Sequence, residues 1–201
     1  MATQITGHFI MNSNQYDTYG HWKTFCLNHG IDFDGLYQNQ CVDPLSLLWF
    51  QYGLTFSVGG TLYAYNAWLL AKNYNARPPF VAIDDITQIK RGDAIVFRAD
   101  SWSSYGHVAF ADGNYWQAYR DVNGILRLPC LGQNQGQGAS WGTASIVANL
   151  NINQALGAFR NTNWNSAPPT PPSPTTTKKR LEKPFPWAIY ANKLRNARKL
   201  L

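Results

Sequence analysis

Apolar residues near the N-terminus of the chain recur at helical spacing. Over residues 12–29 they fall every three or four positions, and Gly30 follows as a candidate C-cap; these apolar positions are Tyr16, Tyr19, Trp22, Phe25 and Cys26. This periodicity predicts a first helix. Residues 32–40 are rich in Asp, Gly and Asn, which predicts a loop. Residues 42–52 are again apolar and stop at Gly53, so a second helix is expected there.

The second half of the chain changes to short runs of β-branched and aromatic residues. A third helix is expected over residues 64–73, before Pro78 and Pro79. After Arg91 the short runs cover residues 94–98, 107–112, 115–120, 125–131 and 143–150. Such runs, bounded by turn residues, predict an antiparallel sheet. Helices followed by strands indicate an α+β domain with segregated layers.

The C-terminal part of the chain has a different composition. Residues 166–177 read SAPPTPPSPTTT, which lacks the apolar content of a core and favours an extended, polyproline-like linker. Residues 178–201 could form a short basic helix but are too few for an independent domain. The expected organisation is therefore a folded domain over residues 1–165, a linker and a basic tail.

The formal net charge of +6 is concentrated in that tail. Eight lysines and arginines and a single acid, Glu182, follow residue 165, which leaves the folded part close to neutral. A neutral body does not track a phosphate backbone, so nucleic acid is not expected as its partner. The tail alone has the charge to contact a polyanion, and anionic wall polymers, acidic lipid surfaces and nucleic acid all stay open for it.

The cysteine count bears on the compartment. Three cysteines, Cys26, Cys41 and Cys130, cannot form a closed disulfide framework and leave at least one free thiol. This fits synthesis in a reducing cytoplasm. Residues 1–11 lack a basic start followed by a long apolar run, and no later stretch approaches about 18 consecutive apolar residues. We therefore expect neither a signal peptide nor a membrane span.

Cys41 is the candidate nucleophile because it lies at the predicted start of the second helix. Exposed N–H groups and the helix dipole lower the pKa of a thiol at such a position, and the thiolate is the reactive form. The alternative is a small buried side chain, which is the favoured interpretation for Cys26 and Cys130. His107 begins an expected strand after a polar loop, where its ring could face a thiolate or be purely structural. Together Cys41 and His107 would supply the nucleophile and base of acyl transfer.

Four short motifs together resemble one known family. They read Gln40-Cys41-Val42-Asp43, Asn66-Ala67-Trp68, Gly92-Asp93-Ala94-Ile95-Val96-Phe97 and Gly106-His107-Val108-Ala109. In this order, over roughly residues 25–150, they resemble the CHAP family, the cysteine, histidine-dependent amidohydrolases/peptidases found in bacteriophage lysins. The resemblance implies a papain-like (NlpC/P60-type) α+β fold, with N-terminal helices packed on an antiparallel sheet. It also implies hydrolysis of peptide or amide bonds in bacterial peptidoglycan.

The resemblance implies catalytic roles for individual residues. Cys41 attacks a carbonyl carbon, and His107 accepts the thiol proton and later protonates the leaving amine. The N–H of Cys41 and the side chain of Gln40 are the implied donors of the oxyanion hole.

The third member of the site departs from the family pattern. Many relatives have Glu-x-Asn after the histidine strand, where this chain has Gly132-Gln133-Asn134. Asn134 would orient the ring of His107 through its amide oxygen. Its alternative interpretation is a turn residue. Asp112 and Asp121 are the candidate carboxylates that would substitute for the missing glutamate.

The segment before Cys41 has the spacing of a calcium loop. Asp32, Asp34 and Asp43 occupy positions 1, 3 and 12 of a twelve-residue window, where calcium loops carry oxygen ligands. Glycine falls at position 4 rather than 6, and the other interpretation is an Asx-turn that leads into a helix. The chain is similar here to CHAP domains of staphylococcal phage lysins, which implies a structural calcium ion with further oxygens from Leu36 and Gln38. No organic cofactor is expected.

Three functions stay open on the sequence. The leading one is a peptidoglycan hydrolase, either an endolysin or a virion-associated lysin, made in the bacterial cytoplasm and acting on the cell wall, with the tail bound to wall polymers or a virion component. The second is a wall-binding or structural virion protein that has kept the fold without the activity. The third is a cytosolic cysteine protease or deamidase. Aromatic residues could line a substrate groove or belong to the core: Trp49, Trp68, Trp102, Tyr105, Trp116 and Trp141.

Overall fold

The computed structural model describes residues 3–36, 38–55, 72, 76–99, 104–136 and 142–164. The helix expected over residues 64–73 lies outside the described residues, apart from Lys72. The linker and the basic tail also lie outside them. All that follows concerns the folded part before residue 165.

Two α-helices precede the sheet in the chain. Helix α1 (Tyr19–Cys26) begins at Thr18, whose side chain accepts a hydrogen bond from the N–H of His21. It is shorter than residues 12–29, because the chain turns at Asn28 with a φ of 64°. Gly30 does not cap the helix as expected; it lies in strand β2, where any side chain would collide with that of Asn39.

Helix α2 (Asp43–Gln51) confirms the second expected helix. It begins two residues after Cys41, with Pro44 in its first turn. Its buried apolar residues are Leu45, Leu47, Leu48 and Trp49. Because both of its sides are covered, the helix is held by packing rather than by caps.

Seven strands form one sheet in which every pairing is antiparallel. The strands are β3 (Phe80–Ile83), β4 (Ala94–Phe97), β5 (His107–Ala111), β6 (Tyr119–Arg120), β7 (Leu126–Gly132), β8 (Ile146–Asn151) and β9 (Ala155–Asn161). Their order is β3-β9-β4-β5-β7-β6, and β8 pairs with β7. A separate pair, β1 (Thr3–Thr6) and β2 (His29–Asp32), is parallel. The expected α+β class with an antiparallel sheet is confirmed.

The strand predictions need two corrections. Residues 115–120 were expected to be one strand, but Tyr115–Gln117 forms a 3-10 turn and only the last two residues join the sheet. Two further 3-10 turns, Ile86–Gln88 and Ile152–Gln154, connect strands. Strands β1, β2, β3 and β9 were not expected, because they are short or lack a clean alternation.

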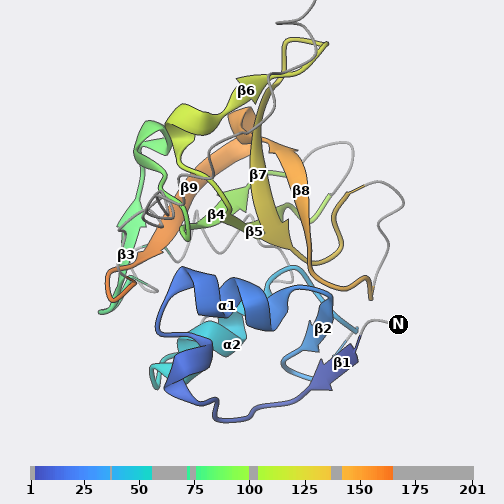
Figure 1. Cartoon of the computed structure of the whole chain (residues 1–201), viewed down its shortest axis with the longest axis vertical. Helices are drawn as coiled ribbons and strands as arrows, with labels where there is room; N and C mark the ends of the chain where they lie inside the picture. Colours follow the sequence, from blue (N-terminus) through green and yellow to red (C-terminus); the bar gives the residue numbers. More distant parts are fainter. Residues whose placement is uncertain are drawn as a thin grey trace, which may run out of the picture. The chain divides into compact units, whose positions relative to one another are not determined.

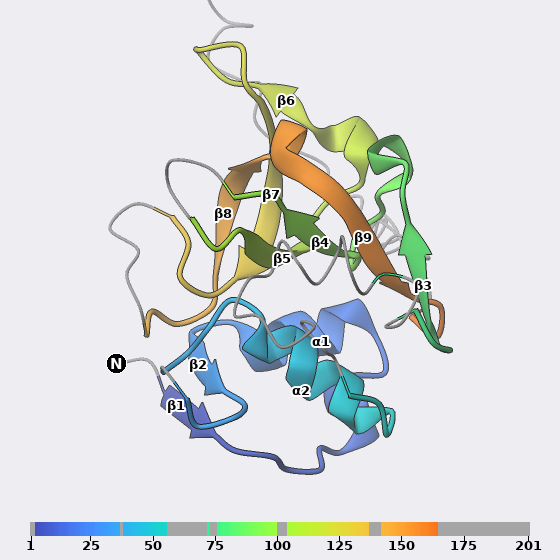
Figure 2. The ribbon, with the colours of Figure 1, turned by 180° about the vertical axis from the view of Figure 1, so that it is seen from behind.

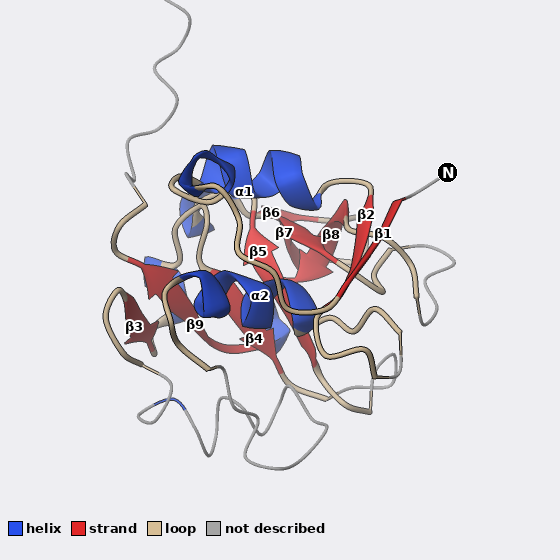
Figure 3. Cartoon of the chain, turned by 90° about the horizontal axis from the view of Figure 1, so that it is seen from below, coloured by secondary structure: helices blue, strands red, loops and turns tan. Residues whose placement is uncertain are grey.

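Both helices lie on one face of the sheet, as the two opposite views show (Figure 1, Figure 2). Seen from below, the helices lie in front and the strands of the seven-stranded sheet behind (Figure 3). The layer between them contains Trp22, Leu48, Trp49, Phe80, Val96, Val108, Phe110 and Phe159. A second cluster contains the alternate residues of the same strands, including Ile95, Ala109, Leu128, Cys130 and Ala158. This alternation is the reason why strands β4 and β5 are buried on both faces.

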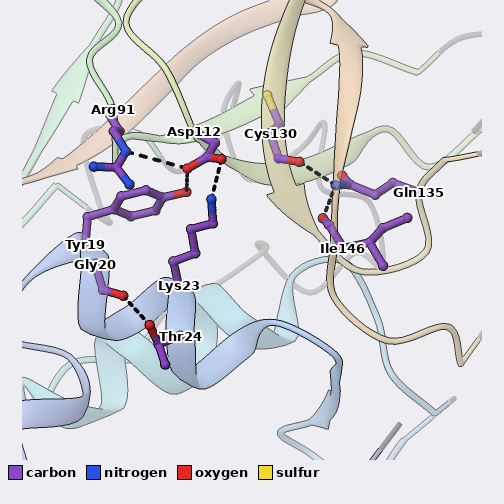
Figure 4. Close-up of polar contacts among 9 residues, drawn as sticks. All are labelled: Tyr19, Gly20, Lys23, Thr24, Arg91, Asp112, Cys130, Gln135 and Ile146. Carbon is purple, nitrogen blue, oxygen red and sulfur yellow. Dashed lines mark hydrogen bonds and ion pairs between the residues drawn. The ribbon is translucent and has the colours of Figure 1, made fainter. Parts of the chain in front are cut away.

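Asp112 ties helix α1 to the end of strand β5. Its carboxylate lies 2.5 Å from the ammonium of Lys23 and accepts a hydrogen bond from the hydroxyl of Tyr19 at 3.2 Å. The guanidinium of Arg91 lies 3.5 Å away and also over the ring of Tyr19 (Figure 4). Burial and the Asp112 charge hold the pKa of Tyr19 well above its usual value. The cluster fixes the helix layer against the sheet that carries His107.

Candidate active site

The structure places Cys41 against the beginning of strand β5. The residue is partly buried and lies in the turn before helix α2, where the N–H of Asp43 bonds to the carbonyl of Gln40 at 3.2 Å. Its thiol faces the main-chain N–H of Val108, the residue that follows His107. The candidate nucleophile and the strand of the candidate base, which are far apart in the sequence, therefore come together.

Burial, and to a lesser extent the charge of Asp43, raises the pKa of the Cys41 thiol to about 11. The N–H groups of Val108, Cys41 and Val42 act in the opposite direction but do not offset the loss of hydration. The resting residue is thus a neutral thiol at pH 7, and any reaction at its sulfur requires a neighbouring base.

His107 is a buried residue at the first position of β5, paired with Phe97 of β4. Its Nε2 lies 3.0 Å from the side-chain oxygen of Gln135. The amide nitrogen of Gln135 donates to the carbonyls of Cys130 at 2.7 Å and Ile146 at 2.8 Å, as the close-up shows (Figure 4).

These contacts decide which ring nitrogen of His107 carries the proton. Both donor hydrogens of the Gln135 amide are used, which fixes the orientation of the amide with its oxygen toward Nε2, and an amide oxygen can only accept. Nε2 of His107 must therefore donate, which leaves Nδ1 as the nitrogen that takes up a proton. A buried amide thus sets the tautomer of the candidate base.

Asn134 was expected to contact the ring of His107, but in the structure the next residue, Gln135, makes this contact. The φ of Asn134 is 52°, and its side chain is directed to the loop that precedes Cys41. Its amide nitrogen donates to the carbonyl of Asn39 at 2.5 Å. Its oxygen accepts from the N–H of Thr143 at 3.0 Å and from the hydroxyl at 3.1 Å. The run Gln133-Asn134-Gln135 in the sequence indicates that an amide could face His107. It does not indicate which of the three amides does so.

The two candidate carboxylates, Asp112 and Asp121, form ion pairs away from His107. Asp112 follows β5 at the opposite end from His107 and belongs to the Lys23 cluster. Asp121 pairs with Arg127 at 2.8 Å in the turn between β6 and β7. Both carboxylates already stabilise other parts of the fold.

Gln40 holds the turn before the nucleophile. Its N–H donates to the carboxylate of Asp43 at 2.6 Å, and its side-chain nitrogen donates to the carbonyl of Leu36 at 3.0 Å. Its own carbonyl accepts from Gln133 at 2.7 Å. The side chain thus lies one residue before Cys41 but points along the loop in this state. Its role in an oxyanion hole stays an expectation.

The three loop aspartates lie close enough to influence one another. Asp34 accepts from the N–H of Leu36 at 2.8 Å and so makes an Asx-turn, while Asp32 accepts from the N–H of Gly35, three residues on, at 2.9 Å. Asp43 is buried; burial first, and then the charges of Asp34 and Asp32, raise its pKa to about 8.

The fit of this loop to calcium is incomplete. Within the described ranges, no three His, Cys, Asp or Glu side chains are grouped so as to hold a metal ion. Leu36 and Gln38 are exposed beside the aspartates. The mutual repulsion of the carboxylates is a feature that a cation would relieve, but calcium binding stays a prediction.

The aromatic residues divide between core and surface. Trp49 is buried and stacks on Phe80 with ring centroids 4.5 Å apart, so it belongs to the core. Trp116 is 78% exposed and Tyr105 41% exposed. The other three aromatic candidates, Trp68, Trp102 and Trp141, lie outside the described residues.

The fold resembles that of an endolysin of known structure. The crystal structure of a wild-type endolysin, LysIME-EF1, superposes with a TM-score of 0.52 at 21% sequence identity. The match covers 72% of this chain and 62% of that chain. No protein-family model matches the sequence. At this level of identity the likeness establishes a shared fold. Among the described residues, no helix is long and apolar enough to cross a membrane.

Proposed function

We propose that the chain is a cysteine hydrolase that cleaves an amide bond of bacterial peptidoglycan, as a CHAP-type phage lysin. The observation that carries this proposal is the juxtaposition of the Cys41 thiol with the start of β5, where Gln135 sets the tautomer of His107. The endolysin with a similar fold supports peptidoglycan as the substrate. Acyl transfer requires a nucleophile, a base and a group that orients the base, and Cys41, His107 and Gln135 would fill these three roles.

The chemistry proceeds in two steps. Nδ1 of His107 takes the thiol proton as the sulfur of Cys41 attacks the amide carbon, and the same proton passes to the departing nitrogen as the C–N bond breaks. The resulting thioester is hydrolysed by a water molecule that His107 activates in turn. The N–H of Cys41 and the side chain of Gln40 would stabilise the oxyanion of both tetrahedral intermediates.

The orienting group in this chain is neutral. Gln135 fixes the ring of His107 but does not supply a charge to stabilise the imidazolium that forms during reaction. Together with the raised pKa of Cys41, this favours transfer of the proton during attack over a preformed thiolate–imidazolium pair.

Lysis of cell walls tests the proposal directly. Purified walls of susceptible bacteria should lose turbidity with the natural chain, and Cys41→Ala and His107→Ala should abolish this. His21→Ala is the matched control, because His21 is an exposed histidine paired with Asp17 at 2.6 Å. Equal clearing by the natural chain and Cys41→Ala, or no clearing by either, would contradict the assignment. Mass spectrometry of the digest would show whether the muramoyl–alanine amide or a bond in the stem or cross-bridge is cut.

A non-catalytic role is the second candidate, and the high pKa of Cys41 is the observation that favours it. A wall-binding or structural virion protein would sediment with walls without clearing them. Cys41→Ala would then bind as well as the natural chain.

We further propose that residues 178–201 contact anionic wall polymers or a virion component. Truncation at residue 165 should weaken sedimentation with walls. The sedimentation that the tail supports should decline as the salt concentration rises.

A further inference from the structure

Three consecutive amide residues follow strand β7, and each reaches a different part of the site. We propose that Gln133 and Asn134 are positioning residues that hold the Cys41 loop at a set distance from His107, with Gln135 holding the ring. This inference rests on the proposed function, because it concerns the same nucleophile and base. It assigns a role to two residues that do not touch the reacting atoms.

Gln133 bridges strand β2 and the residue before the nucleophile. Its side chain is completely buried. The amide nitrogen donates to the carbonyl of Gln40 at 2.7 Å and to that of Ile31 at 2.9 Å. The amide oxygen accepts from the N–H of Ile31 in a short hydrogen bond. Every polar atom of the side chain therefore has a partner, which makes it a rigid link inside the core.

Asn134 holds the residue that comes one earlier in the loop. It donates to the carbonyl of Asn39, a residue that is 1% exposed. The side chain of Asn39 donates in turn to the carbonyl of Gly142 at 3.1 Å. The two carbonyls immediately before Cys41 are thus held by two successive residues of one segment.

The same segment is anchored to the strand that carries the base. Strand β7 pairs with β5 through Leu131 and Phe110, and Gly132 follows directly. A side chain at Gly132 would approach the oxygen of Gln135 to 2.7 Å and the Cβ of Ala109 to 3.0 Å. Glycine therefore allows the amides to pack tightly against β5. One rigid unit consequently contacts both the nucleophile loop and the histidine.

Distance control matters in this site because the thiol has to be deprotonated during attack. Proton transfer needs the sulfur and Nδ1 within hydrogen-bond reach, and a displacement of about 1 Å lowers such rates by about a hundredfold. Cys41 contacts the sheet through Val108, but its loop is exposed on the side of Leu36. Hydrogen bonds to the carbonyls of Asn39 and Gln40 would prevent this loop from moving away.

The hydrogen bonds of Gln133 explain why an amide and not an acid is required. The side chain donates to two carbonyl oxygens and accepts from one N–H. An ionised carboxylate in its place could only accept, and its charge would face both carbonyls. Gln133→Glu therefore separates a positioning role from that of a catalytic carboxylate, which would raise activity at neutral pH.

The test uses full-length protein and two readouts, cell-wall lysis and alkylation of Cys41 by iodoacetamide. Cys26 and Cys130 are completely buried, so alkylation of the folded chain reports Cys41. For Gln133→Glu we expect kcat to fall by about tenfold or more with KM nearly unchanged. Relative to the natural chain at each pH, the loss should diminish as the pH falls, because the introduced carboxyl can donate one hydrogen bond once it is protonated. Burial raises the pKa of this carboxyl, so the change should begin above the usual range of a glutamate. Gln117→Glu is the matched control, since Gln117 is exposed and its oxygen only accepts, from Asn114.

The alkylation readout keeps the inference separate from the proposed function. If the natural chain does not lyse walls, altered alkylation kinetics in Gln133→Glu would still support positioning. If Gln133→Glu does not fold, Asn134→Asp decides, because it keeps the acceptor for Thr143 and loses only the donor to Asn39. Unchanged kcat and unchanged alkylation at every pH in the folded variant would overturn the inference.

Discussion

Nε2 of His107 donates to the oxygen of Gln135 at 3.0 Å, and the nitrogen of the same amide is committed to the carbonyls of Cys130 and Ile146. Gln135 therefore contacts both the sheet and the candidate site. Its two donor bonds join the end of β7 to the beginning of β8, and its acceptor bond fixes the histidine. Loss of this side chain should affect stability and activity together.

Gln135→Leu tests this dual role. The substitution keeps the volume but removes all three hydrogen bonds inside the core, so we expect the free energy of unfolding to fall by about 2 kcal/mol. Because the ring of His107 loses its orientation, kcat should fall by about a hundredfold. Urea denaturation and the initial rate of wall lysis measure the two effects.

Gln88→Leu controls for the change of chemistry, because Gln88 is an exposed amide that bonds to Asp85 at 3.3 Å. It should leave kcat unchanged. A Gln135→Leu variant with normal kcat would show that the histidine does not depend on this amide.

Asp93, a buried residue directly before β4, forms an ion pair with the half-buried Arg160 of β9. The guanidinium lies over both carboxylate oxygens, at 2.9 Å from Nε and 2.7 Å from Nη2. Burial raises the pKa of Asp93 and the arginine opposes this, so the carboxylate depends on its partner. Arg160→Leu should lower the free energy of unfolding by about 3 kcal/mol, measured by urea denaturation at pH 7.

Asp93→Asn in the same chain provides the control for that pair. The double variant carries no uncompensated charge and should recover part of the lost stability. If the double variant were less stable than Arg160→Leu alone, the pair would not be the cause of the loss.

The sequence predicted those parts of the fold whose side chains repeat regularly. Helix α2 and strands β4 and β5 are buried along most or all of their lengths, so their apolar runs were unambiguous. Strand β9 contains Gly157 and Arg160 within an apolar run and was missed. The first helix was extended too far, because its aromatic periodicity continues past the capping residue Thr18 in the N-terminal direction.

The sequence indicated Cys41 and His107 of the candidate site, but not which amide contacts the histidine. Cys41 and His107 are each distinctive at a boundary between elements, and the fold brings the loop of one to the strand of the other. Asn134 was expected beside the ring of His107, but the structure brings Gln135, one position later, to Nε2 of the ring. The three adjacent amides have the same chemistry. The direction of each side chain depends on where strand β7 ends and on the left-handed backbone conformation of Asn134. Local sequence does not contain that information.

The buried carboxyl of Asp43 should make stability depend on pH. Its usual pKa is 3.8 and burial raises it to about 8 in the folded chain, so between these values the folded state binds more protons than the unfolded state. Stability should therefore decrease as the pH rises from about 5 to 8 in the presence of a chelator. We expect a loss of about 3–4 kcal/mol in urea denaturation.

Asp43→Asn should remove this dependence, because the amide stays neutral and its oxygen can still accept from the N–H of Gln40. Asp17→Asn, at an exposed position on the approach to α1, should retain it. A natural chain that becomes more stable between pH 5 and 8 would contradict the raised pKa.

Calcium should reverse the loss of stability that the ionisation of Asp43 causes. If the cation binds among Asp32, Asp34 and Asp43, it favours the ionised carboxylates, and at a hundred times its Kd it adds about 2.7 kcal/mol to the stability of the folded state. The melting temperature of the full-length chain at pH 8 should then rise on addition of calcium and return with EGTA. Asp34→Asn should abolish the rise and Asp17→Asn should not, since Asp34 lies in the loop and Asp17 outside it. Equal responses of the two variants would mean that calcium acts elsewhere on the chain, and the loop aspartates would then serve only as turn residues.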